Sequence, residues 1–147
     1  MTTVASTGNP TRWDELIVGT AAAPFVDRPL TITDFVRYQG ASGDMNPIHH
    51  DDGFARAAGF PGPFAVGMLQ MGVLGTYVTD WLGAENVRKL AVQFREQAWP
   101  GDVLTYTGTV AARREENAER LVDLDLVVTR QTGGVHLKGT ATFVVPT

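Results

Sequence analysis

The residue types best suited to chemistry gather in one stretch, which runs from Tyr38 to His50 and reads YQGASGDMNPIHH. The stretch holds one carboxylate, Asp44, and a proline at position 47 bends the chain between this carboxylate and the imidazole of His49. A carboxylate and an imidazole that face one water molecule are sufficient for general acid–base catalysis. The same residues also fit a plain turn, in which Asp44 caps the next segment and the histidines are solvated.

A metal site is a second chemistry to consider, because His49-His50-Asp51-Asp52 groups potential ligands. Neighbouring residues seldom point at the same ion, and no third histidine stands at ligand spacing. The chain has no cysteine, which excludes a thiolate nucleophile and a cysteine zinc site. We therefore predict no metal. The remaining histidine, His136, lies in an alternating segment and is expected to be an ordinary surface or sheet residue.

The motif S-G-D-M-N-P-I-H at residues 42–49, with the aromatic Tyr38 before it, resembles the signature of the MaoC-like hydratases. These are also called R-specific enoyl-CoA hydratases and dehydratases. The resemblance implies a hot dog fold, in which an antiparallel sheet wraps around one long buried helix. It also implies that Asp44 and His49 are the catalytic pair, which would interconvert trans-2-enoyl thioesters and (3R)-3-hydroxyacyl thioesters. Coenzyme A or carrier-protein phosphopantetheine would belong to the substrate, and no separate cofactor is expected.

Four further residues complete the predicted site. Asn46 is expected to orient the loop or the water, and Ser42 to act mainly in the turn. Gly67 follows a rigid Gly/Pro connector and opens an apolar helix, whose first amides are unpaired and carry partial positive charge, so it is expected to stabilise the thioester oxygen. The resembling family commonly has a histidine before this glycine. Here Val66 stands in that place, and we expect a preference for bulkier acyl groups.

The elements around these residues predict an α+β class. Residues 67–82 are apolar on nearly all sides, which indicates a buried helix that is too short and too rich in glycine to span a membrane. From Val87 onward the hydrophobic pattern alternates with a period of two, and residues 131–134 form a hairpin signal. Long consecutive strands with short turns indicate an antiparallel meander.

Shorter elements are expected before the buried helix. Residues 13–19 should form a turn that packs Trp13, Leu16 and Ile17, and residues 25–30 an edge strand, because prolines flank and interrupt it. Residues 31–38 should form a helix with Thr33 as its N-cap, which the glycines after it should end. Residues 51–58 should form one more helical turn.

The chain has 147 residues, which we interpret as a disordered N-terminus over residues 1–12 and a single domain over residues 13–147. Its formal charge is −4 and it has no basic run, so nucleic acid is an unexpected partner. The polar N-terminus has no apolar signal core, and the absence of cysteine fits a cytoplasmic protein.

A half-wrapped sheet leaves the central helix and one sheet edge uncovered, which predicts a dimer. The partner could be a second copy or a related hot dog subunit. An alternative function is therefore a subunit of a heterodimeric dehydratase that acts on long-chain or steroid side-chain enoyl thioesters. A hot dog thioesterase fits less well, because the motif at residues 42–49 is not its pattern.

Overall fold

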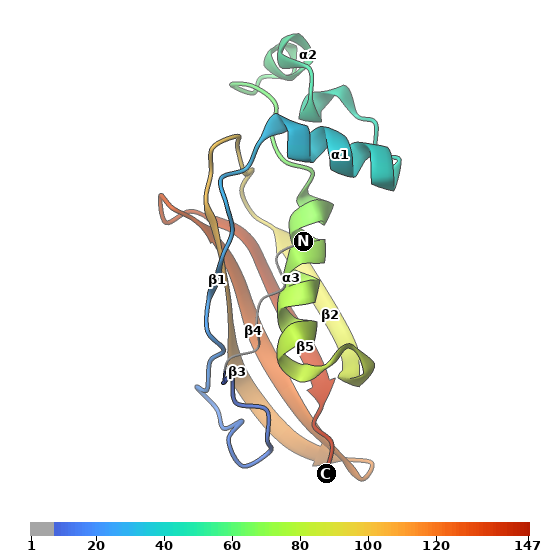
Figure 1. Ribbon diagram of the computed structural model, residues 1–147, viewed down its shortest axis with the longest axis vertical. Helices are drawn as coiled ribbons and strands as arrows, with labels where there is room; N and C mark the ends of the chain where they lie inside the picture. The colour runs from blue at the N-terminus through green and yellow to red at the C-terminus, as the bar shows by residue number, and fades with distance from the viewer. Residues whose placement is uncertain (1–7) are drawn as a thin grey trace.

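The computed structural model describes residues 8–147, which form an antiparallel sheet of five strands that curls around one helix (Figure 1). The strands lie in the order β1-β3-β4-β5-β2. Their bounds are β1 (Phe25–Val26), β2 (Val87–Phe94), β3 (Leu104–Glu116), β4 (Glu119–Arg130) and β5 (Val135–Val144). The predicted meander is confirmed for β3, β4 and β5, and β2 joins the far side of β5 in antiparallel register.

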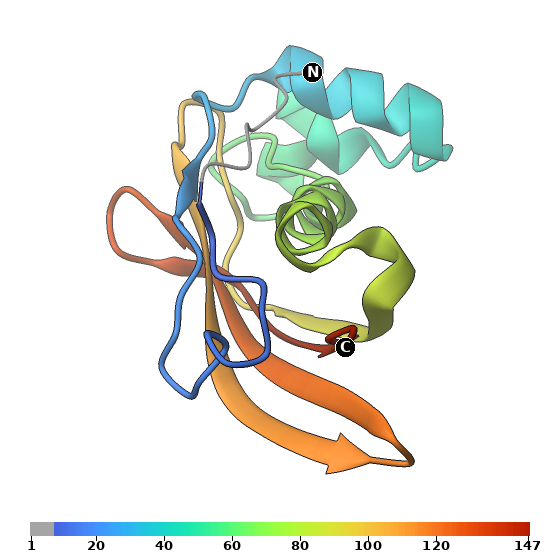
Figure 2. The same cartoon turned by 60° about the horizontal axis from the view of Figure 1, so that its bottom comes forward.

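The helices are α1 (Ile32–Ser42), α2 (Asp52–Ala57) and α3 (Gly67–Leu82), with short 3-10 turns at Pro47–His49 and Ala84–Asn86. Figure 2 shows α3 in the hollow of the sheet, and Figure 1 shows α1 and α2 beyond one end of α3. The bounds predicted for the central helix are confirmed. Its inner side buries Leu74, Val78 and Trp81 against the sheet, whereas Met68, Gly72 and Thr76 leave an exposed stripe along the other side.

The helix α1 has an earlier N-cap and a later end than predicted. Its N-cap is Thr31, not Thr33, because Thr31 and Asp34 form a reciprocal capping box in which each side chain accepts from the other's backbone N–H. Gly40 does not end the helix. A mid-helix glycine costs about 1 kcal/mol, and burial of Phe35 on the same helix offsets that amount. The helix ends at Gly43, whose φ of 78° is the left-handed conformation that glycine adopts without strain.

The N-terminal segments also differ in part from the predictions. Residues 1–7 of the expected disordered segment lie outside the described residues. From Asn9 the chain is held to the domain, since Asn9 Oδ1 accepts from the Ala23 amide at 2.9 Å and the Pro10 carbonyl accepts from Trp81 Nε1 at 2.7 Å. In the turn that follows, Leu16 is buried as expected, but Ile17 is exposed. The first strand keeps only its two paired residues, in keeping with its prolines.

One buried carboxylate fixes the turn that enters β3. Asp102 accepts hydrogen bonds from the Trp99 amide at 2.8 Å, from Arg130 Nε at 2.7 Å and from Gln131 Nε2 at 2.8 Å. Burial alone would raise the pKa of Asp102, but the hydrogen bonds from Arg130, Trp99 and Gln131 outweigh it and leave that pKa lowered. The turn is thereby tied to the hairpin between β4 and β5.

We predict that Asp102→Ala lowers the free energy of unfolding by about 3 kcal/mol, because the mostly buried Arg130 loses its partner at 2.7 Å and keeps only Glu96 at 3.8 Å. The contribution of Asp102 should be complete above the unfolded carboxyl pKa of about 3.9, and it should disappear as the pH falls through the lowered folded pKa. Urea unfolding of the unchanged protein and of Asp102→Ala between pH 3 and pH 7 measures this contribution. If the destabilisation by Asp102→Ala stayed constant down to pH 3, Asp102 would not be the ionised partner of Arg130. Asp125→Ala, on exposed β4 surface, is the control.

Candidate active site

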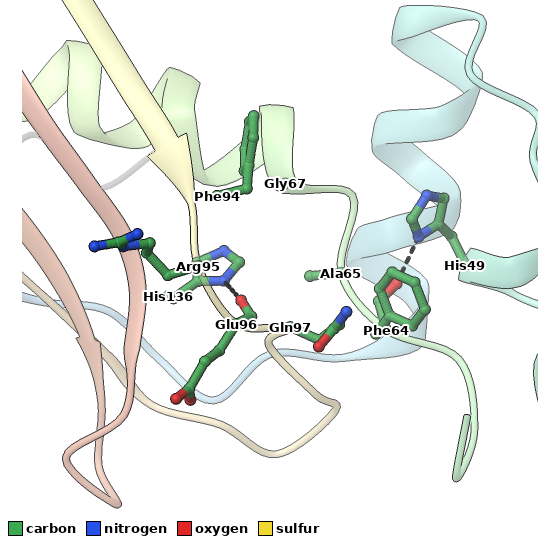
Figure 3. A pocket seen from close by; sticks show the side chains of 9 residues that line it. All are labelled: His49, Phe64, Ala65, Gly67, Phe94, Arg95, Glu96, Gln97 and His136. Atoms are coloured by element: carbon green, nitrogen blue, oxygen red, sulfur yellow. Dashed lines mark hydrogen bonds between the residues drawn. The ribbon is translucent and has the colours of Figure 1, made fainter. Parts of the chain in front are cut away.

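A pocket of about 200 Å³ lies where α3, β2 and the connector before α3 meet. Figure 3 shows His49 on one side of it and His136 on the other, with Ala65 and Gly67 between them. Phe94, at the end of β2, also lines the pocket. Two residues of the predicted site, His49 and Gly67, are thus brought to one cavity by separate elements.

The imidazole of His49 is held in one orientation by the connector. Its Nδ1 lies 2.8 Å from the carbonyl oxygen of Phe64, and because a carbonyl only accepts, Nδ1 carries the hydrogen. In the neutral ring, Nε2 therefore keeps a free lone pair. The Phe64 ring packs edge to face against the imidazole, with 5.2 Å between the two ring centroids. It also packs edge to face against the Trp99 ring, with 5.7 Å between centroids. His49 is buried, so its position is set by packing as well as by the hydrogen bond.

Asp44 lies on the same loop, in an exposed position, and it is not among the residues that line the pocket. Its Oδ1 accepts from the Asn46 amide at 3.3 Å, and its own amide donates to Ser42 Oγ at 3.3 Å. Asn46 Oδ1 accepts from the Ile48 amide at 3.1 Å and caps the 3-10 turn that carries His49. The side chains of Ser42 and Asn46 are therefore engaged in the loop itself.

Gln39 was not singled out from the sequence, yet it holds this loop together. It is 2% exposed, and its Nε2 donates to the carbonyls of Asp44 at 2.8 Å and Asn46 at 2.9 Å. Its Oε1 accepts from Nδ1 of His50 at 2.8 Å. The signal that could have found Gln39 is its spacing of four residues from Phe35, which places both on the buried face of α1.

Gly67 is the first residue of α3, and within the described residues its amide donates to no other backbone or side-chain group. A Cβ added to Gly67 would lie 2.6 Å from the Phe94 ring, so the ring occupies the space that a side chain would need. Val66 is the N-cap residue, but its side chain makes no capping bond. It is buried and does not line this pocket.

His136 is a sheet residue on β5, which is one of the two outcomes expected, but it does not lie on the surface. It is 2% exposed and is one of the residues that line the pocket. Across residues 8–147, no group of three or more His, Asp or Glu residues is arranged to hold a metal ion. No helix in the described part of the chain is long and apolar enough to cross a membrane.

A curled antiparallel sheet around one long helix is the hot dog fold. Residues 17–132 match the family model described as the MaoC like domain. The chain belongs to the MaoC-like dehydratase family, and the resemblance of the motif at residues 42–49 is thereby confirmed.

Relatives in Mycobacterium tuberculosis include 3-hydroxyacyl-thioester dehydratase Y, which is 40% identical over 68 residues, or 44% of this chain and 23% of that protein. Enoyl-CoA hydratase ChsH3 is 34% identical over 97 residues, or 58% of this chain and 34% of that protein. The matches thus span only about a quarter to a third of these relatives. Among solved structures, the (R)-hydratase from A. caviae involved in PHA biosynthesis superposes with a TM-score of 0.77 at 25% identity, covering 89% of this chain and 98% of that one.

We predict that Gln39→Glu lowers kcat about 10- to 100-fold at neutral pH, because a carboxylate cannot donate to the carbonyls of Asp44 and Asn46 and displaces the loop. The introduced carboxyl regains a donor when it is protonated, so activity relative to the unchanged protein should recover as the pH falls toward about 4–5.

The matched control is Gln39→Met, which is similar in length but makes no hydrogen bond at any pH. Its activity relative to the unchanged protein should be low throughout the pH range. Enoyl-thioester hydration is measured for all three proteins on samples whose folding is checked by circular dichroism. Equal relative activity of the two variants at every pH would argue against the role given to the Gln39 amide.

Proposed function

We propose that this chain catalyses the reversible addition of water to a trans-2-enoyl thioester to give a (3R)-3-hydroxyacyl thioester. The observation that carries the proposal is the pocket that His49 and Gly67 both line: Nε2 of His49 keeps a lone pair, and the amide of Gly67 has no partner among the described residues. The names of the relatives support it, since both M. tuberculosis proteins are named for enoyl or hydroxyacyl thioesters.

Hydration of this substrate has three requirements, which the residues of the site divide between them. The thioester oxygen gains negative charge as water attacks C3, and the Gly67 amide at the positive end of α3 can donate to it. A proton must leave the attacking water, and a proton must reach C2. Asp44 and His49 supply the acceptor and the donor for these transfers, and no separate cofactor takes part.

In this proposal Asp44 acts from the loop that also carries His49, and its side chain, which is exposed and does not line the pocket, has to turn toward the substrate. The Gln39 amide holds the Asp44 and Asn46 carbonyls together, and the 3-10 turn starting at Pro47 then delivers His49 to the pocket. The substrate is an acyl group on coenzyme A or on carrier-protein phosphopantetheine. A hot dog thioesterase would instead release free thiol, which a thiol reagent detects in the same assay.

If Asp44 and His49 serve one transition state, the rate reductions caused by removing each of them should not be additive. Asp44→Asn keeps the shape of the side chain and removes its charge, and His49→Ala removes the imidazole. Each is expected to lower kcat by about 10²–10⁴ with a smaller change in KM, and the double variant should be little worse than the poorer single one. The measurement is the loss of enoyl absorbance of crotonyl-CoA.

The same proposal fixes the stereochemistry, because both groups act from one face of the double bond. In deuterated water the product should carry deuterium at C2 on the face that receives the C3 hydroxyl, which NMR of the product resolves. Full activity of Asp44→Asn, or anti addition, would mean that this loop does not perform the chemistry.

The chain works as a dimer in this proposal, with either an identical subunit or a related hot dog subunit. The surfaces that support it are the exposed stripe of α3, where Met68 is 50% exposed, and the outer edge of β2, which ends in Phe94 at 53% exposed. An open strand edge and apolar side chains left in water are both covered by association.

We therefore expect light scattering to give the mass of a dimer for the purified chain alone or with its hot dog partner. Met68→Glu should shift the mass toward the monomer, because it places a carboxylate in the proposed interface. Its place in the first turn of α3 favours a negative charge, so the helix itself should not suffer. Thr132→Glu, in the exposed β4–β5 turn, is the control. A fully active monomer would rule the dimer out.

A further inference from the structure

The second histidine of the loop, His50, has no part in the chemistry described above. It follows His49 directly, but the two imidazoles are held by different groups. His49 is buried and bound to the Phe64 carbonyl, whereas His50 is exposed and its Nδ1 lies 2.8 Å from Oε1 of Gln39 on α1. The loop thus carries an ordered imidazole whose role is still open.

The orientation of the Gln39 amide follows from its other partners. Its nitrogen lies 2.8 Å from the Asp44 carbonyl and 2.9 Å from the Asn46 carbonyl, and carbonyl oxygens only accept, so both contacts require the NH₂ group. A reversed amide would set Oε1 against two carbonyl oxygens. Oε1 therefore faces His50, and Nδ1 of His50 must carry the hydrogen of that contact.

This hydrogen bond is compatible with both charge states of His50. In the neutral ring, a hydrogen on Nδ1 leaves the lone pair on Nε2, and in the protonated ring both nitrogens carry a hydrogen. Nδ1 donates to Gln39 in either case. The contact therefore holds Gln39 in one orientation whether or not His50 is protonated.

The same bond closes the loop at its base. Gln39 lies in the last turn of α1 and His50 directly follows the 3-10 turn, so the bond joins residues eleven positions apart. Asp44 and His49 both lie between them. The Asn46 carbonyl, which accepts from Gln39, also accepts from the His49 amide at 3.2 Å. The Gln39 amide is thereby connected to the backbone of both proposed acid–base residues.

Loss of the donor at position 50 has a direct effect on this amide. Oε1 of Gln39 loses its only hydrogen bond among the described residues, although the side chain is 2% exposed. A buried polar atom without a partner is unfavourable by about 1–3 kcal/mol, so the amide turns or shifts until Oε1 finds a donor. Such a movement weakens the bonds from Nε2 to the Asp44 and Asn46 carbonyls.

We propose that His50 is a positioning residue for the acid–base loop. Its Nδ1–H holds the Gln39 amide in the orientation that supports the Asp44 and Asn46 carbonyls, and so it keeps Asp44 in place. The inference rests on the proposed function, in which Asp44 takes part in the proton transfers. His50 acts through Gln39 and contacts neither the substrate nor the reacting atoms.

The first test compares two substitutions of nearly equal shape. His50→Asn places an amide nitrogen near the position of Nδ1 and retains a donor, whereas His50→Leu has none. His50→Leu should lower kcat for crotonyl-CoA about 2- to 12-fold, the range for one uncharged hydrogen bond. KM should change little, because the residues that line the pocket keep their places. His50→Asn should retain most of the activity. Equal kcat in the two variants would overturn the inference.

The second test asks whether His50 acts through Gln39. In Gln39→Met, which has no amide to orient, a further His50→Leu change should not lower kcat again. If the two reductions were additive, His50 would act independently of Gln39 and the inference would be wrong.

A third measurement does not depend on activity. NMR of the ring nitrogens shows which one carries the hydrogen, and in the unchanged protein the neutral His50 ring should carry it on Nδ1. Gln39→Met should remove this preference. A hydrogen on Nε2 alone in the unchanged protein overturns the positioning role, whereas failure of the unchanged protein to hydrate crotonyl-CoA overturns the proposed function.

Discussion

The hydrogen bond from His49 to the Phe64 carbonyl joins the two halves of the site. His49 comes from the loop after α1, and Phe64 belongs to the connector that leads into α3. The bond is 2.8 Å long and the His49 ring is buried, so water has little access to compete with it. It selects the tautomer of His49 and sets the loop at a fixed place relative to Gly67. The bond thus ties the loop that carries the proposed acid–base residues to the segment that leads into the open end of α3.

The parts around this bond are arranged in series. Phe64 packs on Trp99, the Trp99 amide binds Asp102, and Asp102 is held by Arg130 at the end of β4. On the other side, Gln39 fixes the loop from within α1. Rigid elements thus support a loop that is itself mostly irregular, which is the arrangement that precise placement of reacting groups requires.

The sequence was informative about the fold because its signals were local and strong. The apolar run at residues 67–82 and the alternation after Val87 each have one clear structural solution, and both were found where predicted. The motif at residues 42–49 identified the loop and its histidine. Gln39 and His136 were missed for a physical reason. Gln39 is important because it is buried and binds carbonyls five and seven residues away in an irregular loop, and His136 is held by a carbonyl 40 residues away. A period or a spacing in the sequence does not report such contacts.

The contact between Gly67 and the Phe94 ring has a consequence for how the sequence can change over evolution. The ring fills the space of the absent side chain, so any larger residue at position 67 requires the Phe94 ring to shift. Because Phe94 ends the edge strand β2 and lines the pocket, a shift of its ring also changes the pocket wall. The two positions are therefore coupled, and a larger residue at 67 is accommodated either by a displaced ring or by a smaller residue at 94.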